Sequence, residues 1–248
     1  MALENLILFM AVGFSAQLID GALGMAYGIS ATTVLLGFGV PPATASASVH
    51  AAEVFTTGAS GLSHWALGNV DFELFRRLAI PGMVGGAIGA FLLSNVPGEA
   101  IRPFVSAYLL LIGMLILRKA FRKAPLRTEP PKYATLLGLM GGFLDAIGGG
   151  GWGPLVTSNL VGQGAVPRYA IGSTNLAEFF VSVTVTFMFL FTIGLDLWPI
   201  IAGLIIGGII AAPLAAYVTA RVPDQPLMIL VGVVISLLSL RGILQAFG

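Results

Sequence analysis

The chain has 248 residues, of which 57% are hydrophobic and 9% charged, and its mean hydropathy is +0.96. Soluble domains carry about 25% charged residues, so the composition excludes an ordinary soluble domain and indicates an all-α polytopic membrane protein. The net charge of +1, with no basic cluster beside aromatic residues, excludes nucleic acid as a partner, and the absence of cysteine excludes disulfides, thiolate metal sites and a cysteine nucleophile.

The N-terminal segment from Met1 to Ile19 lacks a basic leading region and contains Glu4. Cleaved signal peptides begin with positive charge, so we expect a membrane segment that is retained.

Apolar stretches follow one another along the whole chain, and about 20 residues are needed to cross a bilayer. Four stretches are too short, because fifteen helical residues reach only about 22 Å of a roughly 30 Å core. They form two pairs, each broken at a glycine-rich centre, and each pair is predicted to be a re-entrant hairpin. The pairs are 5–19 with 29–40 and 134–144 with 154–161, and the six longer stretches are 43–67, 78–96, 103–117, 169–193, 198–220 and 226–247.

The second glycine-rich centre, Gly141 to Pro154, combines one carboxylate with the poorest helix formers. Glycine is about 1 kcal/mol and proline about 3 kcal/mol less favourable than alanine inside a helix. The sequence therefore predicts a helix break here, with Pro154 in the first turn of a new half-helix, where its missing N–H costs nothing.

An internal repeat relates the two halves at an offset of 125 residues, without a gap from Asp20 to Ala90. Rare polar residues coincide between the halves, and a shared apolar composition does not explain this. The coinciding pairs are Asp20 with Asp145, Glu53 with Glu178, Ser48 with Ser173, Asp71 with Asp196 and Thr32 with Thr157. We therefore predict two homologous modules, 1–117 and 134–248, each with a broken helix followed by three transmembrane helices.

The segment 118–133 between the modules is predicted to be a cytoplasmic linker, because it is rich in Lys and Arg. One hairpin and three spans per module give inverted repeats. A parallel arrangement with eight full crossings places the basic residues almost as well, and the shortness of the half-segments favours inversion.

Ionisable residues within the apolar runs include two aspartates and two glutamates, each pair related by the repeat: Asp20, Asp145, Glu53 and Glu178. A charge at mid-bilayer costs at least about 2.5 kcal/mol, so each needs a partner, a proton or a watery cavity. The aspartates precede the glycine breaks and could either accept backbone N–H bonds or couple transport to H⁺ or Na⁺. The glutamates are predicted to line a cavity and to take part in the same coupling.

No Lys or Arg lies within the central spans, so an anionic ligand would have to be held by backbone N–H groups and half-helix N-termini. We predict such a site between the two glycine breaks. Tyr27 and Trp152 could gate it or merely pack, and His50, which replaces Asn175 of the other module, could line it or form a hydrogen-bonded part of the core. The candidate substrate-binding residues are Gly24, Tyr27, Gly28, Thr32, Ser48, His50, Gly148, Gly149, Gly150, Gly151, Trp152, Thr157, Ser173, Thr174 and Asn175.

An enzymatic alternative rests on Ser60 and His64. Gly58 to Gly61 matches the Gly-x-Ser-Gly signature of rhomboid proteases, but their histidine lies on a later helix, and no histidine follows His64 here. We therefore predict that the chain is not an enzyme.

The chain resembles the TauE/SafE family of bacterial membrane transporters over almost its whole length. The resemblance is carried by the two modules, by Phe143 to Pro154, and by Gly172 to Asn175 at the start of the following span. It implies a multi-pass protein of the cytoplasmic (inner) membrane that moves sulfite or an organosulfonate outward.

The predicted function is a secondary transporter, an exporter of a small anion, driven by a proton or ion gradient because no nucleotide-binding signature is present. No cofactor or metal is expected. The alternatives are import of another anion, such as sulfate or a carboxylate, or a membrane-embedded enzyme. The oligomeric state is left open, a homo-oligomer included.

Overall fold

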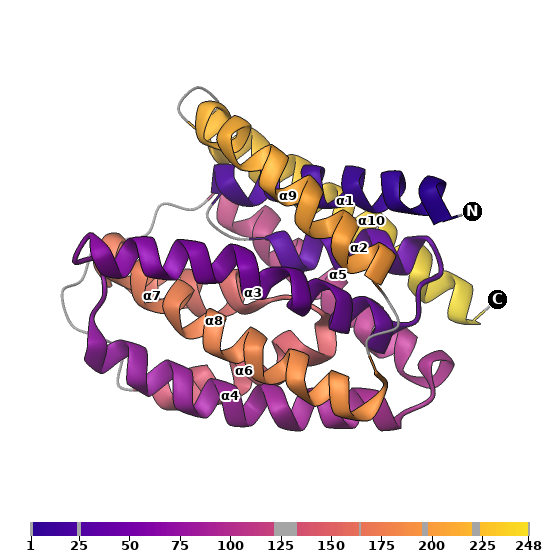
Figure 1. The fold of residues 1–248 in the computed structure, drawn as a ribbon, viewed down its shortest axis with the longest axis horizontal. Helices are drawn as coiled ribbons and strands as arrows, with labels where there is room; N and C mark the ends of the chain where they lie inside the picture. Colours follow the sequence, from indigo (N-terminus) through magenta and orange to yellow (C-terminus); the bar gives the residue numbers. More distant parts are fainter. Residues whose placement is uncertain are drawn as a thin grey trace.

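The structure, a computed structural model, describes residues 2–23, 26–121, 133–163, 165–194, 198–219 and 224–247, and this part of the chain is built from helices and turns without strands (Figure 1). The predicted all-helical architecture is confirmed. The helices are, in chain order, α1 (Ala2–Leu23), α2 (Tyr27–Gly37), α3 (Pro42–Ala66), α4 (Phe72–Asn95), α5 (Gly98–Ala120), α6 (Ala134–Gly148), the π-helix η1 (Gly153–Thr157), α7 (Ser158–Gly162), α8 (Pro167–Thr192), α9 (Trp198–Thr219) and α10 (Asp224–Phe247).

Four described helices are long and apolar enough to cross a membrane: Phe72–Asn95, Gly98–Ala120, Tyr169–Thr192 and Met228–Gln245. α3 has 25 residues, but it is less apolar because it carries buried polar side chains such as His50 and Glu53. Shorter apolar stretches in α1, α2, α6 and α9 complete the set. These helices are those of a protein that crosses the bilayer several times.

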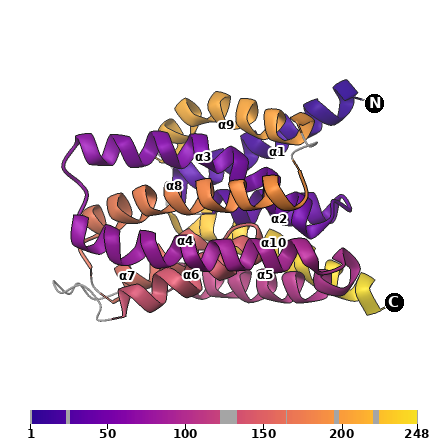
Figure 2. The same cartoon turned by 60° about the horizontal axis from the view of Figure 1, so that its bottom comes forward.

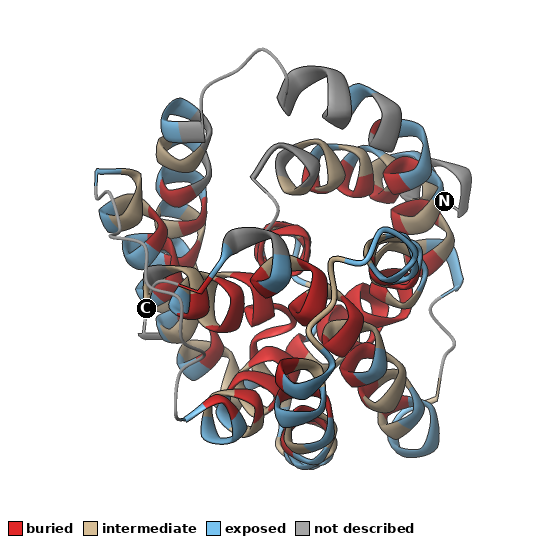
Figure 3. Ribbon diagram, turned by 90° about the vertical axis from the view of Figure 1, so that its left-hand side faces the viewer, coloured by how far each residue is buried: buried red, intermediate tan, exposed pale blue. Residues whose placement is uncertain are grey.

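The helices pair across the two predicted modules. α1 packs most extensively against α9, and its repeat counterpart α6 packs against α4, the counterpart of α9. α3 packs on its own counterpart α8, and α5 on α10 (Figures 1 and 2). The modules therefore share one core, whose buried residues gather along the centre of the bundle (Figure 3). The module boundaries and the inverted orientation stay predictions, and most of the proposed linker, 122–132, lies outside the described residues.

Glycines allow these helix pairs to approach closely. A Cβ on Gly207 of α9 would come within 2.7 Å of the Phe14 backbone nitrogen of α1, whereas one on the adjacent Gly208 would meet the Tyr27 ring at an ordinary 3.8 Å. Small residues at such contacts are typical of membrane helix pairs, where packing replaces the hydrophobic driving force.

We therefore expect Gly207→Ala to destabilise the protein by about 1–3 kcal/mol, because the added methyl overpacks against backbone. Gly208→Ala should be neutral or slightly stabilising, since alanine is about 1 kcal/mol better than glycine in a helix. Thermal unfolding of the two purified variants measures the difference. Equal unfolding temperatures would contradict the close α1–α9 contact.

Candidate functional site

The second helix break lies between α6 and η1, where the sequence predicts it. α6 ends at Gly148, Gly149 takes the left-handed conformation (φ 66°), and the Gly150 N–H donates to the Asp145 carbonyl at 2.9 Å. Gly150 and Gly151 continue with φ of 141° and 147°, values that side chains rarely permit. The chain resumes as η1 at Gly153, with Pro154 in its first turn as predicted.

The first break shares one described backbone feature with the second. α1 ends at Leu23 and α2 begins at Tyr27, preceded by Ala26 with φ 125°. Ala26 is the repeat counterpart of Gly151, so the two breaks share a positive φ although only one of them has glycine there. The candidate residue Gly24 lies outside the described residues.

The two aspartates cap the breaks in the same way. Asp20 Oδ1 accepts the Tyr27 N–H at 3.1 Å, and Asp145 Oδ1 accepts the Trp152 N–H at 2.9 Å, each seven residues further along the chain. These are the backbone hydrogen bonds that the sequence offered as one alternative. A coupling role for either aspartate stays a prediction.

The two breaks touch through main chain. A Cβ on Gly28, in the first turn of α2, would lie 2.8 Å from the Gly150 Cα, so the two segments meet with no side chain between them. The Thr32 hydroxyl donates a hydrogen bond to the Gly149 carbonyl and fastens α2 to the second break. The segments expected to form one site are thus brought together.

Asp145 also contacts a buried histidine. His50 Nε2 lies 3.2 Å from Asp145 Oδ2, and His50 Nδ1 lies 2.9 Å from the Ser46 carbonyl. A carbonyl only accepts hydrogen bonds, so Nδ1 carries a proton, and the contact at Nε2 then needs one more proton, held by either partner. The pair is therefore neutral overall. His50 belongs to this buried network and does not line the cavity described next.

A cavity of about 260 Å³ opens beside the meeting point of the breaks. Three of the four predicted carboxylates line it, together with Tyr27, Gly28, Gly151 and Asn175 of the candidate site. Among the described lining residues there is no Lys or Arg. The complete lining is Gln17, Asp20, Ala26, Tyr27, Gly28, Ile29, Glu53, Thr56, Thr57, Ser60, His64, Gly151, Gly153, Pro154, Ile171, Asn175 and Glu178.

One face of α3 lines the cavity, and beyond the predicted Glu53 it supplies Thr57, Ser60 and His64, which we did not predict as substrate-site residues. Glu53, Thr57, Ser60 and His64 recur at the i, i+4, i+7, i+11 spacing of a helix face, and this periodicity was the available signal. The Ser60 hydroxyl accepts a hydrogen bond from Asn175 Nδ2 at 2.8 Å, whereas His64 Nδ1 lies 3.4 Å from Asn69 Nδ2. The serine and histidine of the protease alternative are therefore engaged with other residues.

Other candidate residues do not line the cavity and make contacts within or between the surrounding helices instead. Ser48 donates to Thr44 of its own helix, and Ser173 Oγ accepts the N–H of Asp71 before α4. The hydroxyls of Thr157 and Thr174 join η1 to α8 at 2.9 Å. Gly148 packs under the Tyr108 ring. Substrate contacts for these residues stay predictions.

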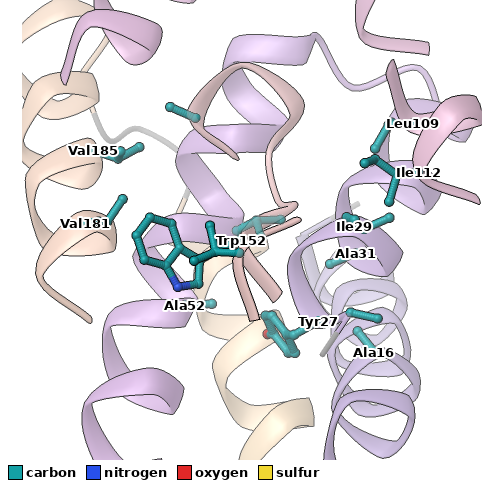
Figure 4. Close-up of a cluster of buried hydrophobic side chains, with 14 of the residues drawn as sticks. Ala16, Tyr27, Ile29, Ala31, Ala52, Leu109, Ile112, Trp152, Val181 and Val185 are labelled. Atoms are coloured by element: carbon teal, nitrogen blue, oxygen red, sulfur yellow. The ribbon is translucent and has the colours of Figure 1, made fainter. Parts of the chain in front are cut away.

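Tyr27 and Trp152 are buried next to the breaks (Figure 4). The Tyr27 hydroxyl donates to the Leu204 carbonyl at 3.2 Å, and the Trp152 ring N–H donates to the Thr174 carbonyl at 3.1 Å. Trp152 packs beside Val181 of α8 (Figure 4). Each ring thus anchors its break to a helix of the second module, which favours packing over gating.

We expect Ala26→Gly to raise the unfolding temperature, although the same change usually destabilises a protein. A non-glycine residue at a sparsely populated positive φ stores about 1–3 kcal/mol, which glycine would release. Thermal unfolding tests this, with Ala52→Gly inside α3 as the control that should lose stability. A lower unfolding temperature for Ala26→Gly would contradict the conformation of the first break.

Asp145→Ala should cost about 3 kcal/mol, because it leaves the Trp152 N–H and His50 Nε2 without partners. Asp145→Asn should cost less than about 1 kcal/mol, because its oxygen can still accept the N–H and its amide can donate to Nε2. Thermal unfolding distinguishes the two variants. Equal losses would mean that the pair needs a charged carboxylate beside a protonated imidazole.

Comparison with known proteins identifies the family of the chain. The sequence model described as "Sulfite exporter TauE/SafE" matches residues 9–242. The chain is 43% identical over 252 residues to the "Probable membrane transporter protein YtnM" of Bacillus subtilis (strain 168), covering 98% of this chain and 84% of the relative. It is 28% identical over 163 residues to the "Probable membrane transporter protein YdhB" of the same organism, covering 63% of this chain and 66% of that relative. No solved structure matches.

The described helices include several that are long and apolar enough to span a bilayer, and the relatives are transporters and not enzymes. The chain belongs to the TauE/SafE family of membrane transporters.

Proposed function

We propose that this transporter exports a small anion, sulfite or an organosulfonate, and binds it where the two helix breaks meet. The carrying observation is the backbone contact between Gly28 and Gly150 beside the 260 Å³ cavity. The family description supports the solute class, and the relatives support transport.

Binding in this proposal relies on main-chain donors. The first N–H groups of a helix have no partner within it, and a helix N-terminus carries about half a positive charge. α2 begins at the cavity, and Gly28, Gly151 and Gly153 line it, so an anion can approach main-chain N–H groups without crossing a Cβ.

In this proposal the site lies near the middle of the bilayer. Broken helices that meet near the bilayer midplane are the usual setting for alternating access, in which one repeat rocks against the other. The electrochemical gradient of protons or of another ion, including its membrane potential, supplies the energy. The cytoplasmic membrane is the proposed location, with 118–133 on the cytoplasmic side. The candidates for coupling transport to the gradient are the carboxyl groups of Asp20, Glu53, Asp145 and Glu178.

The acidic lining favours a second candidate, transport of a small cation. Asp20, Glu53 and Glu178 line the cavity without a cationic side chain among the described residues, and a cation would neutralise them directly. Transport of sulfate or a carboxylate, or import in place of export, are further alternatives that the same assay separates.

The test is solute flux in proteoliposomes with two alanine variants of one helix. A Cβ on Gly28 would collide with the second break, whereas one on Gly37, at the other end of α2, would meet only the Leu238 side chain at 3.9 Å. We expect Gly28→Ala to reduce sulfite or methanesulfonate flux at least about tenfold, because small misplacements of binding groups cost that much or more. Gly37→Ala should transport normally.

Thr32→Val reports on the same contact if Gly28→Ala does not fold, since it removes only the hydroxyl that binds the Gly149 carbonyl. Equal flux in the Gly28→Ala and Gly37→Ala variants would remove the break contact from the mechanism. If vesicles with the wild-type protein transport sulfate, a carboxylate or choline, but neither sulfite nor methanesulfonate, the proposed solute is wrong and the transported one takes its place.

A further inference from the structure

The four intramembrane carboxylates separate into two groups by their hydrogen bonds. Asp20 and Asp145 each accept a backbone N–H of a break, and Asp145 is also paired with His50. Glu53 is 3% exposed and lines the central cavity, and its Oε2 has no hydrogen-bond partner among the described residues. Its repeat counterpart Glu178 lines the same cavity. Both aspartates are therefore engaged with the backbone, although Asp20 also lines the cavity, whereas Glu53 faces the cavity with a carboxylate oxygen that has no described partner.

Glu53 lies near three other carboxyl groups. The carboxyl groups of Asp145 (α6), Glu178 (α8) and Asp20 (α1) interact with it electrostatically, and Tyr27 of α2 lines the same cavity. His50 on the same helix is used by Asp145, and His64 lies at the far end of the lined face of α3. Tyr108 of α5 is directed toward the glycines of the second break. Among the described lining residues no Lys or Arg can compensate an ionised Glu53, so an added cation would neutralise it most directly.

A proton suits this place better than a metal ion. The described residues contain no group of three or more His, Asp or Glu side chains arranged to hold a metal. A proton needs only one oxygen, and Glu53 Oε2 is buried and free to carry it. An acid proton there can also donate a hydrogen bond to a bound anion.

We infer that the repeat-related glutamates Glu53 and Glu178, and not the two aspartates, carry the proton that allows an anion to occupy the cavity. This inference rests on the proposed function. Glu53 lies directly against Gly28 at the meeting point of the breaks, so its negative form repels an anion held by the break N–H groups, and its protonated form does not. Proton and anion then bind together and move in the same direction. A proton that leaves with the anion moves against an inward proton gradient. For a doubly charged anion with one proton, the energy for export therefore comes from the inside-negative potential, which drives the net negative load outward.

The proton can be observed without any transported solute. Infrared difference spectra of the purified protein, titrated between acid and alkaline pH in choline chloride, should show the C=O absorption of a protonated carboxylic acid that disappears at high pH. We expect Glu53→Gln and Glu178→Gln each to reduce this band. Glu99→Gln, at an exposed position at the start of α5, is the matched control and should leave it unchanged.

Two spectral outcomes would overturn the inference. The first is a band that survives intact in both glutamine variants, which would place the proton elsewhere, and its loss in Asp20→Asn would identify an aspartate. The second is a wild-type band that vanishes at constant pH when sodium replaces choline, because the site would then take Na⁺. Glu178→Gln decides the first point if Glu53→Gln does not fold.

Anion binding supplies the second arm, with methanesulfonate as the probe because its charge does not change with pH. In the wild type, the apparent affinity measured by calorimetry should fall about tenfold per pH unit once the glutamate is mainly ionised, as expected for one linked proton. In Glu53→Gln the affinity should be nearly independent of pH, whereas an affinity that keeps the wild-type pH dependence would overturn the role of Glu53. A wild type that binds neither methanesulfonate nor sulfite would refute the proposed function, while the infrared arm would still decide where the proton resides.

Discussion

Two stretches of main chain touch near the centre of this protein with no side chain between them, at Gly28 and Gly150, and the surrounding structure serves to keep them there. Asp20 and Asp145 hold the loosened backbone of each break by one hydrogen bond, and Thr32 ties one break to the other. Buried Tyr27 and Trp152 fix the breaks to neighbouring helices. Irregular backbone at membrane depth survives only when its polar groups are satisfied in this way.

The charges around this contact impose a second constraint. Main-chain N–H groups favour an anion, whereas Asp20, Glu53 and Glu178 line the same cavity and oppose one. Asp145 is the exception, because His50 makes a neutral pair with it. Both tendencies can be satisfied only if the cavity changes its net charge when it is occupied. A transporter needs such a change, since its site must bind its solute on one side and release it on the other.

Much of this arrangement could be predicted from the sequence, because rare residues in an apolar chain carry strong information. The glycines of 148–151 and the repeat of Asp20 at Asp145 located both breaks, and Pro154 placed the new half-helix. The positive φ of Ala26 could not be predicted, because an alanine in a sequence does not indicate this backbone conformation. The Thr57 to His64 face of α3 was visible as a periodicity, but a short protease-like motif offered a competing explanation of Ser60 and His64. The capping of Asp71 by Ser173 joins residues about 100 positions apart, which only helix packing brings together.

The pairing of α1 with α9, and of α4 with α6, has a consequence for biogenesis. The first helix leaves the ribosome long before its main neighbour exists, roughly 10 to 40 s earlier at ordinary elongation rates. During that interval the polar groups of α1, and the face of α1 that packs against Gly207 of α9, lack their final neighbours. The nascent first half must therefore wait in the bilayer, incompletely assembled, and the protein can acquire its interior only when translation of the second half is nearly finished.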